Sequence, residues 1–426
     1  MKLFINFISK LGIDTIARLI GFVTLPLITR SLGPEGYGQF TYLFVILSYF
    51  GFFIDFGYFS YGTNKLCEKI DSKVIIGKII SIQILTAIIS FVVLIIVAWF
   101  FLDWEKYILL FIFSLTFLTQ IFSIKYFYLA NNKLYYNSIS ELAGQLTYAG
   151  LVFLVFINYP TVSTLIILSV TQTLVTACFL FIPYARRNKI HIDLNPKSNI
   201  KTLREAYKLG LSSKAEAITA SFIILCLGFF LNEESVGIYN VSYKIYLILL
   251  TVVQGVSYTL MPTLLRNAKI SERNNVKRVS FIFYVYLIVG FILFSFTFIF
   301  SDKIITVMFG EKFMDSVSIL KNFSFTILIW PIVMFMSLVL LAYNKYNYIL
   351  MTSLSAAFFS IIFSLLLINT FGVDGAGYVL PLVALGTIIV SYYFLRRISN
   401  EENFKVSQLF SFGNAVEELR CLVKRK

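Results

Sequence analysis

Long apolar segments recur along the whole chain and constrain its fold more than any other feature. Roughly 20 apolar residues in a helix cross the ~30 Å hydrocarbon core of a bilayer. The 426-residue sequence is 58% hydrophobic and only 14% charged, and a water-soluble domain could not bury that much apolar surface. We predict twelve membrane-spanning helices, at residues 11–29, 39–61, 74–101, 107–129, 138–157, 161–185, 207–231, 236–261, 279–300, 319–342, 348–368 and 376–395.

The second half of the chain repeats short segments of the first half in the same order. Residues 10–12 return as 208–210, and 32–40 correspond to 231–239, at offsets of 198 and 199. Transporters are commonly built from such duplicated halves. Because six spans per half is an even number, the two halves are predicted to be parallel repeats. The predicted fold is all-α, with two pseudo-symmetric six-helix lobes around a central cavity. The lobes are residues 1–185 and 208–395, joined by a cytoplasmic linker at 186–207 and followed by a basic cytoplasmic tail at 396–426.

Lysine and arginine predict the orientation of these helices. Of the 36 basic residues, 28 lie in or beside the segments on one side of the predicted membrane and 5 lie on the other. Cytoplasmic loops carry this excess, so both termini are predicted to be cytoplasmic. The formal net charge of +14 then reflects topology and contact with anionic lipid, and nucleic acid is not an expected partner.

Several ionisable residues fall inside the predicted spans, where a charge that faces lipid costs ~3 kcal/mol or more. Such residues normally face a partner or a water-filled cavity. The basic ones, Arg18, Lys214 and Lys244, are candidates for a substrate cavity. Asp14, Asp55 and Glu216 are candidates for ion coupling or for ion pairs between the lobes. Glu141 lies close to the expected cytoplasmic interface and is interpreted as an ordinary interfacial residue.

The repeat refines the interpretation of these charges. At the offset of 198, Arg18 aligns with Glu216, so each lobe carries an acid and a base in its first helix. Arg18–Glu216 and Asp14–Lys214 are therefore candidate pairs across the lobes. The alternative is an Asp14–Arg18 pair within one helix, with Lys214 extending to the interface.

Specific residues carry a resemblance to a known family. They are Arg18-Leu19-Ile20-Gly21-Phe22, Pro26, the segment 30–38 (RSLGPEGYG), Asp55-Phe56-Gly57 and Val236-Gly237-Ile238-Tyr239. With them the chain resembles the polysaccharide-transporter branch of the multidrug/oligosaccharidyl-lipid/polysaccharide exporter superfamily, which contains the Wzx-type O-antigen and capsule repeat-unit flippases.

The resemblance implies a bacterial inner-membrane protein that works by alternating access. Its cargo would be an oligosaccharide on undecaprenyl pyrophosphate, moved from the cytoplasmic to the periplasmic leaflet. Arg18 matches a cavity arginine of the related peptidoglycan-precursor flippases, whereas Thr24 stands where those proteins carry a second arginine. Expected partners are membrane lipid, a polysaccharide polymerase and a chain-length regulator, with H⁺ or Na⁺ as a coupling ion.

Two other classes of protein remain as alternatives. A small-molecule or drug exporter of the same superfamily would favour an acidic cation site, but the acids here accompany bases. A membrane polysaccharide polymerase would need a large outer loop with catalytic residues, and the longest outer loop expected, 301–318, is short. The four cysteines have no metal-ligand spacing, and no nucleotide-binding loop or nucleophile constellation is present. We therefore expect no enzymatic activity, no metal site and no cofactor.

Overall fold

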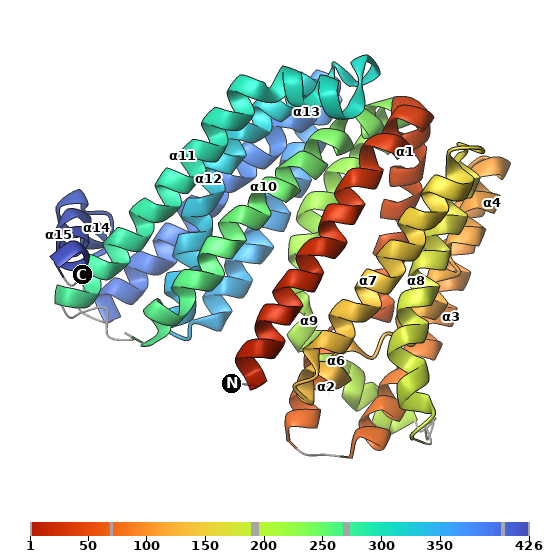
Figure 1. Cartoon of the computed structure of the whole chain (residues 1–426), viewed down its shortest axis with the longest axis horizontal. Coiled ribbons are helices and arrows are strands. Elements are labelled where there is room, and N and C mark those ends of the chain that lie inside the picture. Colours follow the sequence, from red (N-terminus) through yellow and green to blue (C-terminus); the bar gives the residue numbers. More distant parts are fainter. Residues whose placement is uncertain (1, 69–70, 189–195, 267–272, 402–404, 425–426) are drawn as a thin grey trace. The chain divides into compact units, whose positions relative to one another are not determined.

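The computed structural model describes residues 2–68, 71–188, 196–266, 273–401 and 405–424. Every regular element within these ranges is a helix (Figure 1), so the predicted all-α fold is confirmed. The elements are α1 (Lys2–Ile54), α2 (Tyr58–Cys67), α3 (Ser72–Phe101), α4 (Trp104–Phe113), α5 (Thr116–Ile121), α6 (Lys125–Ala130), α7 (Leu134–Leu151), the π-helix η1 (Val152–Phe156), α8 (Val162–Ala185), α9 (Pro196–Phe230), α10 (Glu233–Arg266), α11 (Arg273–Phe309), the short 3₁₀-helix η2 (Glu311–Phe313), α12 (Ser316–Ala342), α13 (Tyr346–Glu401), α14 (Val406–Leu409) and α15 (Phe412–Lys424).

Nine helical segments in the described ranges are long and apolar enough to cross a membrane, which makes this a multi-pass membrane protein. Two of them, Ile16–Cys67 and Tyr346–Glu401, are 52 and 56 residues long. The second contains two predicted spans, and the first contains the span 39–61 and most of the span 11–29. The predicted span 207–231 lies in α9 and is not among the nine. The count of twelve stays a prediction.

A glycine with positive φ interrupts each of the two longest helices. Gly33 in α1 has φ 69° and ψ −179°, and Gly372 in α13 has φ 60° and ψ −137°. Side chains with a Cβ rarely adopt this conformation, so glycine is the residue that permits the break. Pro34 follows Gly33 directly, and proline is well suited to the first turn of a new helical segment. The segment 30–38 is therefore a sharp kink between two helical runs.

The predicted span 107–129 is not one continuous helix but three short ones, α4, α5 and α6. Ser114 Oγ donates to the Phe111 carbonyl at 2.6 Å, and Thr119 Oγ1 donates to the Thr116 carbonyl at 2.7 Å. Such side-chain bonds compete with the regular helical ladder. Hydropathy does not register such breaks, and the whole segment Trp104–Ala130 is still one of the nine that are long and apolar enough to cross a membrane.

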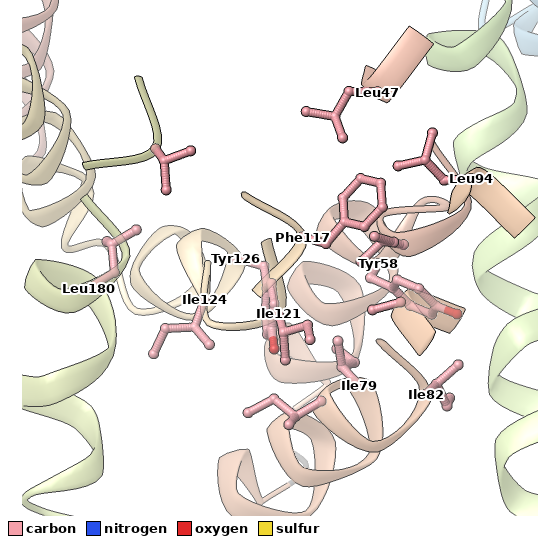
Figure 2. Packing of buried hydrophobic residues seen from close by; sticks show 14 of the residues in the cluster. Leu47, Tyr58, Ile79, Ile82, Leu94, Phe117, Ile121, Ile124, Tyr126 and Leu180 are labelled. Atoms are coloured by element: carbon pink, nitrogen blue, oxygen red, sulfur yellow. The ribbon is translucent and has the colours of Figure 1, made fainter. Parts of the chain in front are cut away.

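The chain divides into two compact units, Met1–Lys214 and Ala215–Lys426. In the first unit α1 packs against α3 and α7, and α7 packs against α8. The apolar core of this unit lies among α1 to α6, α8 and α9. Figure 2 shows part of it, with residues of the broken segment beside those of α2 and α3: Phe117, Ile121, Ile124, Tyr126, Tyr58, Ile79 and Ile82.

In the second unit α12 packs against α10, α11 and α13. The C-terminal helices α14 and α15 pack on α11. Phe410, which follows α14, stacks edge-on to Phe283 of α11 with ring centroids 4.8 Å apart. The tail of the chain is thus part of the core of this unit.

Candidate functional site: a polar pocket in the first unit

A polar pocket of about 450 Å³ lies among α1, α5, α6, α7 and α8 of the first unit. Its volume falls within the range of roughly 300–1,000 Å³ that small-ligand sites occupy. Three of its lining residues are charged, seven are neutral and polar, and three are alanine or glycine. They are Arg18, Lys125 and Glu141; Thr119, Gln120, Ser123, Gln145, Gln172, Thr173 and Thr176; and Ala17, Gly21 and Ala177.

The charged residues come from three different helices. Arg18 is exposed on α1 and lines the pocket. Lys125 begins α6, and its Nζ lies 2.7 Å from Glu141 Oε1 on α7. Both side chains of this pair remain partly exposed, at 35% and 44%, so the ion pair is accessible from the pocket. Two cations and one carboxylate leave the pocket with a net positive charge.

The wall beside these charges is built from amide and hydroxyl groups. Gln172 Nε2 on α8 donates to Gln145 Oε1 on α7 at 2.8 Å. A Cβ added at Gly21 would lie 3.0 Å from Gln145 Nε2, so the small residue on α1 lets this amide approach the helix. Gly144 permits a similar approach, since a Cβ added there would clash with Thr176 Oγ1. Glycines thus bring three helices close enough for their polar side chains to meet.

The breaks between α4, α5 and α6 supply the opposite wall. The short helix α5 carries Thr119 and Gln120, and Ser123 lies in the turn that leads to Lys125. Gln120 Nε2 would lie 2.9 Å from a Cβ placed on Gly51. A glycine therefore makes room for this glutamine on the second half of α1.

Arg18 is the sequence-predicted cavity candidate that the structure places in this pocket. Thr24, at the position of the missing second arginine, is buried, and its Oγ1 donates to the Gly21 carbonyl at 3.0 Å. The pocket has a second cation nonetheless, because Lys125 supplies it from α6.

The other candidates of the first unit lie outside the pocket lining. Asp55 is half-buried just after the end of α1. Lys214 Nζ lies 5.1 Å from the centroid of the Phe52 ring, which is a cation–π distance. The side chain of Asp14 lies outside the described residues.

The remaining two candidates belong to the second unit. Lys244 is half-buried on α10. In the sequence it lies between Tyr243 and Tyr246, whose rings both pack against the Phe323 ring. Glu216 is exposed, and its Oε1 lies 3.4 Å from Ser353 Oγ. The ion pairs expected between the lobes, Arg18–Glu216 and Asp14–Lys214, stay predictions.

Sequence reasoning missed most of the pocket. Glu141, which the sequence indicates as an interfacial residue, also pairs with Lys125 and lines the pocket. A usable signal was present, because Gln120, Gln145 and Gln172 lie in predicted spans. Polar amides are costly in apolar helices unless they find hydrogen-bond partners or water.

Comparison with solved structures defines the class of fold. A structure of the lipid II flippase MurJ in an inward closed conformation has a TM-score of 0.71 with this chain, at 14% identity, and covers 98% of this chain and 92% of MurJ. The inward-facing structure of a multidrug resistance MATE family transporter of the MOP superfamily has a TM-score of 0.68 at 13% identity and covers 93% and 98%. The chain therefore has the fold of these transporters.

The sequence identifies the family within that class. The family described as polysaccharide biosynthesis protein matches residues 3–268, and the chain belongs to it. A protein of Escherichia coli (strain K12) named "Putative O-antigen transporter" is 23% identical over 243 residues, which are 53% of this chain and 56% of that protein. The chain thus spans about half the length of this curated relative. The resemblance carried by residues 18–38 and the other motifs is confirmed.

Proposed function

We propose that this protein is a flippase for an oligosaccharide repeat unit, of O-antigen or capsule type, linked to undecaprenyl pyrophosphate. The observation that carries the proposal is the net positive, hydroxyl- and amide-rich pocket within a membrane-spanning bundle. Family membership and the name of the E. coli relative support the same cargo.

The physical problem of such transport matches the pocket. A pyrophosphate cannot enter hydrocarbon unpaired, because its desolvation costs far more than thermal energy supplies. Arg18 and Lys125 offer compensating charge in a wet, polar site. Arginine is always protonated and can grip a phosphate with two donors, and lysine adds a mobile point charge. The polyprenyl tail stays in the lipid, where it needs no protein site.

The Lys125–Glu141 pair suggests how the empty pocket is kept stable. Glu141 neutralises Lys125 at 2.7 Å when no anion is bound. An arriving phosphate competes with Glu141 for the ammonium group, so the lysine can transfer from one anion to the other. Net movement against a gradient needs a coupling ion, H⁺ or Na⁺, and Asp14, Asp55 and Glu216 are the proposed coupling residues.

The direction of transport follows from the proposed topology. We place the protein in the bacterial inner membrane with both termini in the cytoplasm, on the basis of the 28-to-5 asymmetry of basic residues. The cargo then moves by alternating access from the cytoplasmic to the periplasmic leaflet. Reporter fusions at Lys201 and at the C-terminus should both report cytoplasm, and a fusion near Asp315 should report periplasm. A periplasmic signal at Lys201 would contradict this topology.

A drug exporter of the same fold is the competing function. Drug-sized ligands are bound mainly by hydrophobic and aromatic side chains. The residues that line this pocket include no aromatic side chain, and the apolar ones are only alanine and glycine. The composition of the pocket therefore favours a hydrophilic, anionic cargo.

Reconstitution tests the proposal directly. Purified protein in liposomes loaded with a lipid-linked oligosaccharide should let a membrane-impermeant oxidant, periodate, modify the sugars of both leaflets. Protein-free liposomes should protect the inner half. Arg18→Ala should return the liposomes to this protected state, whereas Arg30→Ala, an arginine outside the pocket lining on the same helix, should not. Protection of the inner leaflet by the wild-type protein, or export of a lipophilic cation instead, would overturn the proposal.

A further inference from the structure

We infer that the amides of Gln145 and Gln172 form a recognition site for the first sugar of the cargo, beside a separate phosphate site at Arg18 and Lys125. This inference rests on the proposed function and adds a residue-level account of how the glycan is held. The lining of the pocket divides into a charged part and a neutral part.

The division follows the helices. On α7, Glu141 precedes Gln145 by four residues, and on α1, Arg18 precedes Gly21 by three. Both intervals are about one helical turn, or roughly 4.5–6 Å along an axis. Gln145 lies against Gly21 and bonds to Gln172, while Glu141 bonds to Lys125. The charges and the amides therefore occupy two adjacent levels, one turn apart.

The two levels suit two chemically different groups. A phosphate presents only acceptors and negative charge, which Arg18 and Lys125 complement. A sugar presents hydroxyl groups that both donate and accept. An amide offers two N–H donors and a carbonyl acceptor with two lone pairs. Gln145 and Gln172 use one donor and one acceptor on each other, which leaves capacity on both amides for a ligand.

Covalent geometry joins the two levels into one site. The anomeric carbon of the first sugar is linked to the outer phosphorus through a single oxygen, so this ring must lie next to the phosphate. A ring at the amide level is therefore in place when the phosphate is at the charged level. Thr173 and Thr176 also line the pocket from α8 and add hydroxyl groups at the same wall.

The competing explanation is that the glutamines only hold α7 and α8 together. Interhelical hydrogen bonds between polar side chains do contribute to packing in membranes. Such a role predicts a loss of thermal stability without any change in how sugar-bearing and sugar-free lipids are distinguished. The sugar site predicts a change in that discrimination, so the two explanations have different readouts.

The experiment measures binding of two probes to purified protein in nanodiscs. The probes are undecaprenyl pyrophosphate and the same lipid carrying one N-acetylglucosamine. The wild type should bind the sugar-bearing lipid more tightly. Gln145→Met and Gln172→Met keep the side-chain length, remove the amide, and should each reduce this preference about two- to tenfold, the effect of one neutral hydrogen bond. Binding of the bare lipid should change little.

Controls separate folding from recognition. Gln83→Met changes a buried glutamine of α3 that does not line the pocket, and it should retain the wild-type preference. If Gln145→Met does not fold, Gln145→Asn, which keeps the amide but shortens its reach, replaces it and should also lose part of the preference.

The outcomes distinguish the inference from the proposed function. Equal binding of both lipids by the wild type, or a preference that survives in both methionine variants, would overturn the sugar site and leave the flippase proposal intact. Failure of the wild type to bind either lipid would overturn the proposed function and the sugar site with it.

Discussion

The two units of this protein use their polar residues differently. In the first unit, Arg18, Glu141 and the glutamines line an open pocket. In the second, buried hydroxyl groups donate to backbone carbonyls of neighbouring helices. Ser316 Oγ bonds to the Ile238 carbonyl at 2.8 Å, and Ser360 Oγ bonds to the Thr219 carbonyl at 2.6 Å.

The same contrast holds for the charges. The Lys125–Glu141 pair lies within the pocket of the first unit. In the second unit Lys277 pairs with Glu417, and Arg278 pairs with Glu418, which joins α11 to the C-terminal helix α15. A repeated sequence therefore does not imply repeated use of polar groups. In one unit they can serve a ligand, and in the other they serve packing.

Among the substitutions that test this contrast, those at Arg18 are expected to have the largest effect. Arg18→Ala should reduce export of surface polysaccharide about a hundredfold or more in a flippase-null strain, because it removes a bidentate, charge-assisted phosphate contact. Arg18→Lys should restore export only partly, since an ammonium group cannot reproduce the two-donor contact that a planar guanidinium group makes with a phosphate. Membrane insertion, measured by immunoblot, should stay normal. Wild-type export by Arg18→Ala would leave this arginine with a structural role alone.

A smaller effect is expected at the ion pair of the pocket. Lys125→Ala should lower transport about tenfold, because it removes one charge-assisted bond to the phosphate. Its effect on unfolding should stay below about 1 kcal/mol, since the pair is one-third to one-half exposed and exposed pairs stabilise weakly. Lys65→Ala, which breaks a pair with Glu68 outside the pocket, is the matched control and should leave transport unchanged. Equal transport defects in the two variants would remove the distinction between the sites.

The sequence predicted the membrane character and the family, and it marked Arg18 as a candidate site residue, because each of these depends on local pattern. Apolar runs identify helices wherever they lie, and an arginine inside such a run is conspicuous at any position. The Lys125–Glu141 pair could not be predicted in the same way. Its members are sixteen residues apart on different helices, and they meet because α6 packs against α7.

The glutamine wall was missed for a related reason. Gln120, Gln145 and Gln172 come from three helices, and the glycines that let two of them approach, Gly21 and Gly51, lie on a fourth. No periodicity within one segment connects these positions. Tertiary packing brings them together, and a single sequence does not display it.

In the second unit, the two ion pairs of α15 should contribute differently to the free energy of unfolding of the protein. Arg278→Ala leaves the carboxylate of Glu418 unpaired, and that side chain is only 11% exposed. Lys277→Ala removes the ion pair with Glu417, whose side chain is 52% exposed and can be solvated. We expect a loss of about 1–2 kcal/mol for Arg278→Ala and under about 1 kcal/mol for Lys277→Ala, measured by thermal unfolding in detergent. Neither change should alter transport per folded molecule. A larger loss of stability in Lys277→Ala than in Arg278→Ala would show that α15 is held by other contacts.

The smallest effect concerns two serines one turn apart on α13. Ser360 and Ser364 are both fully buried, but Ser360 donates to the Thr219 carbonyl of α9, whereas Ser364 Oγ has no hydrogen-bond partner among the described residues. Hydrogen bonds between membrane helices contribute about 0.6 kcal/mol on average, so Ser360→Ala should lower stability by roughly that amount. Ser364→Ala should leave stability unchanged or raise it slightly, because it removes a buried polar group that has no partner. Parallel thermal unfolding curves measure the difference, and transport should stay at the wild-type level in both variants. A transport defect in Ser360→Ala at normal stability would mean that the second unit also uses its polar groups for the cargo, and the contrast between the units would fail.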